Sequence, residues 1–155
     1  MSFTEQLSQS LSLVDKIDPA NNATNNTAYS SSGIDMQKFQ RCMFEIQIGA
    51  NTGPAVLQAK LQSSATSNFA SAHDMTGGSI SNVANTSTNC RVTLETTAEA
   101  VQAQNSGDRY VRLAVTISGT NAAVVFGATG WGGSAPQKPA AAQDPNTVLQ
   151  RLVVT

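Results

Sequence analysis

The sequence Gln40–Gln62, QRCMFEIQIGANTGPAVLQAKLQ, decides the expected fold. Apolar residues at every second position of its first half fall on one side of an extended chain: Cys42, Phe44, Ile46 and Ile48. After the turn-forming residues 49–54, the alternation resumes with Ala55, Leu57, Ala59 and Leu61. Such alternation, broken by Gly, Asn and Gly-Pro, predicts two half-buried strands joined as a hairpin by a short loop.

The same period of two returns later in the chain, at Arg91–Thr97 and again in RYVRLAVTIS, residues 109–118. A tight connection at Gly119–Asn121 then leads into AAVVFGATGW, residues 122–131, which we expect to pair with the preceding strand. Helix propensity is confined to one or two turns at Thr97–Gln104. Several short strands separated by Gly and Asn turns predict an all-β fold, an antiparallel β-sandwich with jelly-roll topology.

The composition divides the chain into three parts. Residues 1–27 are predicted to be an N-terminal arm and loop: 2–16 fit a helix or a short strand, and 18–32 are rich in Asn, Thr and Ser. Residues 28–131 form the sandwich domain, and 132–155 form a Gly/Pro/Ala-rich C-terminal arm.

The C-terminal arm consists of a Pro-rich linker, which we call the leash, followed by a strand-like segment. Gly130–Gly133 is read as flexible, and residues 135–145 hold three of the five prolines, which favours an extended chain. The arm ends in TVLQRLVVT, Thr147–Thr155, which is strand-like and apolar. That strand could return to its own sheet or complete the sheet of a neighbour.

The charge and hydropathy of the chain exclude several classes of partner. Charged residues make up 12% of the chain, against about 25% in ordinary proteins. A formal net charge of −1 argues against a nucleic-acid partner, because phosphate binding needs clustered Lys and Arg. No apolar run approaches the ~20 residues that span a bilayer, and the first residues do not resemble a secretory signal, so we expect synthesis in the cytoplasm and no membrane partner.

The sequence contains no catalytic motif, and we expect no enzyme activity and no cofactor. His73 is the only histidine, which excludes a His-pair metal site, and its neighbour Asp74 is poorly placed to orient it as a base. Cys42 and Cys90 fit no metal-ligand spacing and are expected to be buried thiols. Calcium held by loop carboxylates stays open as an alternative.

Two segments resemble small structural proteins of tailed bacteriophages and prophages. The first is SSGIDMQKFQRCMFEIQIGANTGPAVLQAKLQSS, residues 31–64, with an Asp-x-x-x-Phe opening at Asp35–Phe39 and a strand that ends at Gly49. The second is residues 107–131, where Gly107–Arg112 matches a Gly-x-Arg-Tyr-Val-Arg pattern. The likeness covers residues 30–131. The resemblance fails at Ser67–Phe69, where such proteins carry an aromatic residue in an Asn-Trp type sequence. The N-terminal region and the Pro-rich tail resemble no part of these proteins.

The resemblance implies a virion protein, a capsid cement or decoration protein on the outer surface of the phage head. Its partners would be the major capsid protein and further copies of itself, as a trimer or dimer. A tail, neck or fibre-base protein is the first alternative. A jelly-roll carbohydrate-binding module is the second, with Tyr29, Tyr110 and Trp131 as candidate aromatic platforms. The residues that we expect at the interface are Leu11, Leu13, Val14, Tyr29, Trp131, Pro136, Pro139 and Pro145.

Overall fold

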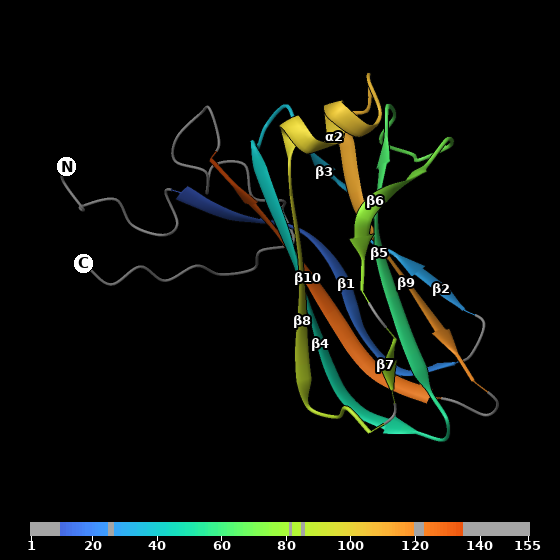
Figure 1. Ribbon diagram of the computed structural model, residues 1–155. Helices are drawn as coiled ribbons and strands as arrows, with labels where there is room; N and C mark the ends of the chain where they lie inside the picture. Colours follow the sequence, from blue (N-terminus) through green and yellow to red (C-terminus); the bar gives the residue numbers. More distant parts are fainter. Residues whose placement is uncertain (1–9, 25–26, 81, 85, 120–122, 135–155) are drawn as a thin grey trace, which may run out of the picture.

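A computed structural model describes residues 10–24, 27–80, 82–84, 86–119 and 123–134 as two antiparallel β-sheets packed face to face (Figure 1). The four-stranded sheet contains β1 (Leu11–Thr24), β4 (Arg41–Thr52), β8 (Cys90–Thr97) and β10 (Ala123–Gly133). The six-stranded sheet contains β2 (Ala28–Ser30), β3 (Ile34–Asp35), β5 (Val56–Ser64), β6 (His73–Ser79), β7 (Val83–Ala84) and β9 (Tyr110–Ser118). The all-β sandwich predicted from the alternation is confirmed.

The strands pair in a nested order. The first strand, β1, pairs with the last, β10, while β2 and β3 pair with β9. Closer to the middle of the chain, β4 pairs with β8, and β5 pairs with β6 and β7. Two further pairings, β10 with β4 and β5 with β9, close the sheets in the orders β1-β10-β4-β8 and β2-β9-β5-β6.

Neither of the two expected hairpins forms. β4 and β5 lie in different sheets, so the turn at Gly49–Pro54 carries the chain across the sandwich, with Gly53 at a φ of 65°. β9 and β10 are likewise separated, and Gly119, at a φ of 122°, begins the crossing. The alternation correctly identified the buried sides of β4, β5 and β9. It could not show that these sides face each other from opposite sheets, which is the arrangement that buries both.

The N-terminal region differs most from the expectation. Residues 18–24 are expected in a loop, and residues 11–16 fit either a helix or a short strand of an arm. The structure has one long strand, Leu11–Thr24, so the strand alternative holds for 11–16 and the loop prediction for 18–24 is wrong. It pairs with β10 from Leu11 opposite Gly133 to Thr24 opposite Ala123, with three irregularities in register. Backbone pairing with β10 thus overrides the turn propensity of Asn, Thr and Ser, because a strand at a sheet edge tolerates polar residues and bulges.

The glycine-rich end of β10 is also a strand. Gly130–Gly133 was read as flexible, yet these residues pair with β1 on one side and β4 on the other. Gly130 and Gly132 face the core, where an added Cβ would be 2.8 Å from Cε1 of Phe44 and 2.5 Å from Cγ of Phe39, respectively. The glycines therefore make room for two phenylalanine rings.

The core lies between the sheets and is built from alternate residues of both. The largest side chains that are almost completely buried are Phe44, Phe126, Ile34, Ile46, Leu57, Leu61, Leu113 and Ile117. The polar segment between β5 and β8 contains β6 and β7. The predicted helical turns form α2 (Ala98–Gln104), capped by the Thr97 hydroxyl, which accepts from the N–H of Ala100 at 3.2 Å. Within the described ranges, no helix is long and apolar enough to cross a membrane.

Candidate functional site

A hollow of about 430 Å³ lies on the outer face of the four-stranded sheet. We call it the Trp131 groove. Strands β1, β4, β8 and β10 all contribute to its wall, and the chain enters and leaves the described sandwich beside it, at Ser10 and Ser134. The side chains and backbone used in the argument below belong to Leu11, Arg41, Met43, Glu95, Trp131 and Gly133.

The groove follows from the register of the sheet. Partners in antiparallel strands point to the same face, so two rows of residues cross the sheet next to each other. One row is Leu13, Trp131, Met43 and Glu95, on β1, β10, β4 and β8 in turn. The next row is Leu11, Gly133, Arg41 and Thr97. Gly133 has no side chain, so the second row is low in its middle. Leu11 leans toward this position, with its Cδ2 3.2 Å from where a Cβ of residue 133 would lie, and Arg41 lies on the other side.

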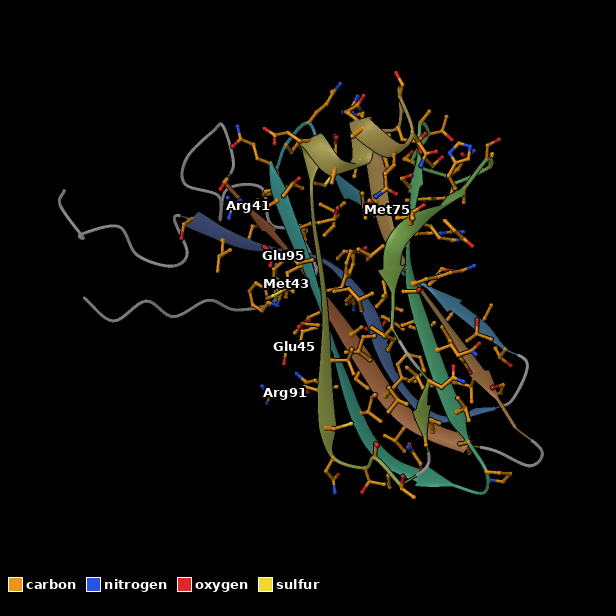
Figure 2. All side chains as sticks on the ribbon, viewed as in Figure 1. Arg41, Met43, Glu45, Met75, Arg91 and Glu95 are labelled. Carbon is orange, nitrogen blue, oxygen red and sulfur yellow. The ribbon has the colours of Figure 1, made fainter. Side chains whose placement is uncertain are left out.

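Charged side chains border the apolar row. Figure 2 shows Arg41, Met43 and Glu95 near one end of the outer side of β4 and β8, with Glu45 and Arg91 further along it. Glu45 forms an ion pair with Arg91 at 3.1 Å, and Arg91 is 71% exposed, so this pair contributes little to stability. Among the residues that the structure describes, neither Arg41 nor Glu95 has an ion-pair partner.

The structure brings together three of the residues expected at an interface and separates two others. Leu11, Leu13 and Trp131 lie on the outer face, and Leu11 is 38% exposed. Tyr29 instead packs against the core, with its ring edge-on to Phe126 at a centroid distance of 5.3 Å. Val14 also packs against the core, at the bulge that follows Leu13. The remaining candidates lie outside the described residues: Pro136, Pro139 and Pro145.

Sequence reasoning did not single out Arg41, Met43 and Glu95. The alternation of residues 40–48 already placed Arg41 and Met43 on the side of the strand opposite the core. The missing information was the pairing partner of that strand. Only the register of β4 with β10 brings Met43 beside Trp131, and only the register with β8 brings Glu95 beside Met43.

A second polar cluster lies at the end of the sandwich that carries α2. The carboxylate of Asp108, which is 4% exposed, accepts a hydrogen bond from the Ser63 hydroxyl at 2.7 Å and lies 2.9 Å from Nδ1 of His73. Asn105 Nδ2 donates to the Ser63 hydroxyl at 3.1 Å. Ser63 is completely buried and directed at the acid, so the cluster lacks the accessible nucleophile next to a base that acyl-transfer chemistry needs.

Asp74 takes no part in this cluster. Its carboxylate accepts from Lys60 Nζ at 2.6 Å and from Gln62 Nε2 at 2.8 Å, on the outer side of the six-stranded sheet. These bonds, the Lys60 bond first, hold the pKa of Asp74 below its ordinary value of 3.8. No group of three or more His, Cys, Asp or Glu side chains that could hold a metal is present within the described part of the chain.

Comparison with known proteins supplies no family for this arrangement. No protein-family model matches the chain, and no curated protein matches its sequence.

Proposed function

We propose that this protein is a structural component of a tailed-bacteriophage virion, a cement or decoration protein that binds the outer surface of the head. It is made in the host cytoplasm and joins the major capsid protein on the particle, as a dimer or trimer. The observation that carries the proposal is the row formed by Trp131 and Met43 with Arg41 beside it. Aromatic residues, Met and Arg are the types enriched in protein–protein interfaces.

The proposal includes the finer topology of the sandwich, a jelly roll. In a jelly roll, a long antiparallel ribbon is rolled up, so that the first strand pairs with the last and each inner strand with its mirror in the sequence. The nested pairing of β1 with β10, β2 with β9, β4 with β8 and β5 with β6 supports this topology. The topology itself does not specify a function, so it supports the virion assignment only in combination with the groove.

The mechanism we propose is joint burial of several small contacts. A stable protein–protein interface involves about 20–30 residues on each side, many more than line the Trp131 groove. Copies linked as an oligomer can bind several capsid subunits at once, and the second contact then forms at a high effective concentration. Low overall charge is consistent with a surface that is covered by neighbours rather than by water.

Re-addition to particles tests the proposal. Particles stripped of the protein would be mixed with the wild-type chain, with Met43→Asp or with Thr116→Asp, and the bound fraction measured by sedimentation. Both changes add a carboxylate to a half-buried outward position of a strand, but Thr116 belongs to the outer side of the six-stranded sheet. We expect Met43→Asp to abolish binding and Thr116→Asp to retain it. Equal binding by all three proteins would contradict the assignment of this face.

The same binding experiment tests the role of the C-terminal arm. Deleting residues 135–155 removes no strand of the two described sheets, since β10 ends at Gly133. We expect the shortened chain to stay folded and to bind particles more weakly. Full binding by the shortened chain would remove the arm from the mechanism.

One observation favours carbohydrate binding as a second candidate function. Of the three aromatic side chains considered as platforms, Tyr29 packs against Phe126 and Tyr110 lies beneath the Arg109 guanidinium at 5.1 Å, whereas Trp131 lies on the outer face beside Arg41 and Glu95. A glycan-array signal that is lost in Trp131→Ala would support this second function. If no glycan binds, the protein–protein interface is the one candidate function that remains for this face.

A further inference from the structure

The outer face of the four-stranded sheet carries more apolar surface than the Trp131 groove alone. The two large apolar side chains that are exposed in the described residues, Leu11 at 38% and Val125 at 37%, belong to β1 and β10 of this sheet. A second hollow, of about 140 Å³, lies further along the same face and is lined in part by Gly127 and Thr129. We call the outward side of β10 the track: it has a hollow at each of two places, and Pro19 of β1 lies over Gly127 between the strands.

We propose that this track, centred on the Trp131 groove, binds the segment Thr147–Thr155 of a second copy of the chain. The inference goes beyond the proposed function and does not depend on a virion. On a particle, the segment bound in the groove would form part of the surface that contacts the capsid, so both contacts can use this face. It assigns a site through which two or more copies associate in solution.

The chemistry of the segment matches the track. TVLQRLVVT has apolar side chains on both sides of an extended chain, so pairing at a sheet edge alone would leave one of its sides uncovered: Val148, Leu149, Leu152, Val153 and Val154. The outer face offers Trp131, Met43 and Leu11 to such a segment. It also offers Glu95, which has no ion-pair partner among the described residues, to the single charged side chain of the segment, Arg151.

The length and composition of the leash favour a neighbouring copy over the same chain. Residues 135–146 hold Pro136, Pro139 and Pro145, and a Pro-rich chain extends at about 3.1 Å per residue, about 37 Å over these positions. The leash begins at Ser134, which itself lines the groove. A fully extended leash would span a length comparable to the whole of β10, whose eleven residues extend about 37 Å. Binding in the same chain would require the leash to reverse.

Trp131 is the only tryptophan in the chain, so its fluorescence reports on the groove directly. Two full-length variants separate the two halves of the contact. The double variant Leu149→Asp with Leu152→Asp keeps Trp131 but places a carboxylate on each side of the segment. The variant Trp131→Phe keeps the segment but emits no tryptophan fluorescence.

Mixing the two variants should shift the Trp131 emission to the blue and reduce its quenching by acrylamide, in a saturable manner. A matched control mixes the double variant with a chain that carries Trp131→Phe together with both Asp substitutions, and here the emission should stay unchanged. No change in the first mixture would overturn the proposal. The proposal would also be overturned if the Trp131 emission of the wild type were shielded from acrylamide to the same degree at all dilutions, because that result indicates binding within one chain. The test uses no particles, so its failure leaves the capsid proposal to be judged by particle binding.

Discussion

Gly132 of β10 lies against the ring of Phe39, so close that a Cβ at position 132 would be 2.5 Å from both Cγ and Cδ1 of that ring. The two residues are far apart in the sequence, and Gly132 is held in register between Ser12 of β1 and Cys42 of β4. The absence of a side chain at this position is what allows the phenylalanine ring to close this end of the core.

Gly132→Ala should therefore destabilise the fold. A methyl group at this position forces the Phe39 ring or the β10 backbone to move, and overpacking of this kind costs about 1–3 kcal/mol. The control is Gly49→Ala, whose Cβ would meet Val125 at an ordinary 3.4 Å. Urea unfolding should show a loss for Gly132→Ala and almost none for Gly49→Ala. Equal effects of the two changes would contradict the packing role of Gly132.

The carboxylate of Asp15 connects β1 to the turn before β3 and should make the fold less stable as pH rises. It accepts from the N–H groups of Ser32 at 3.0 Å and Gly33 at 2.8 Å, and burial raises its pKa above the ordinary 3.8 in spite of these bonds. The folded state thus holds this proton more tightly than the unfolded chain. The stabilising contribution is complete below 3.8 and is lost as pH rises through the folded pKa.

Asp15→Asn isolates this effect because the amide does not ionise. The free energy of unfolding of the wild type minus that of the variant should fall between about pH 3 and about pH 7. The measurement is urea unfolding of both proteins across that range. A difference that grows with pH would show that the hydrogen bonds outweigh burial and that the pKa is lowered.

Asp35 should show the opposite slope. Its oxygens accept from Arg109 Nε at 2.7 Å and Nη2 at 2.5 Å, and this bidentate contact lowers the pKa of Asp35 below 3.8. The stabilisation is present above 3.8 and is lost as pH falls through the folded pKa. Wild type and Asp35→Asn should therefore differ most at neutral pH and converge in acid, by the same unfolding measurement. A constant difference across the range would contradict the role of the carboxylate charge.

The two cysteines should differ in reactivity. Cys42 is 2% exposed, and burial raises the pKa of its thiol to about 12, so it carries almost no thiolate at neutral pH. Cys90, also expected to be a buried thiol, is instead half-buried, and its thiol donates to the Ser87 carbonyl at 3.5 Å. A thiol reagent should label Cys90 alone in the folded protein and both residues in denaturant. Labelling of folded Cys90→Ser would place Cys42 outside the core.

The sequence was informative about strands and uninformative about their partners. Alternation located the buried sides of β4, β5, β8 and β9 because burial of one side leaves a period of two in the chain. Pairing depends on residues that are distant in sequence. The turn at Gly49–Pro54 has the composition of a hairpin turn, and nothing local in it distinguishes a hairpin from a crossing between sheets.

The errors at the two ends of the described chain have a common cause. Asn- and Thr-rich residues 18–24 and Gly-rich residues 130–133 have weak local preferences for strand, and their conformation is set by pairing of β1 with β10. The same limit applies to the candidate site. Leu11, Leu13 and Trp131 could be named from the sequence as large apolar residues near the ends, but their meeting with Met43 and Glu95 depends on the register of four strands.

The central claim, that the protein covers a phage head, is tested most directly by counting its copies in purified virions. Quantitative mass spectrometry against the major capsid protein gives that number. The account predicts many copies in a simple ratio to the capsid subunit. A handful of copies would place the protein in the neck or tail, and complete absence from the particles would contradict the virion assignment.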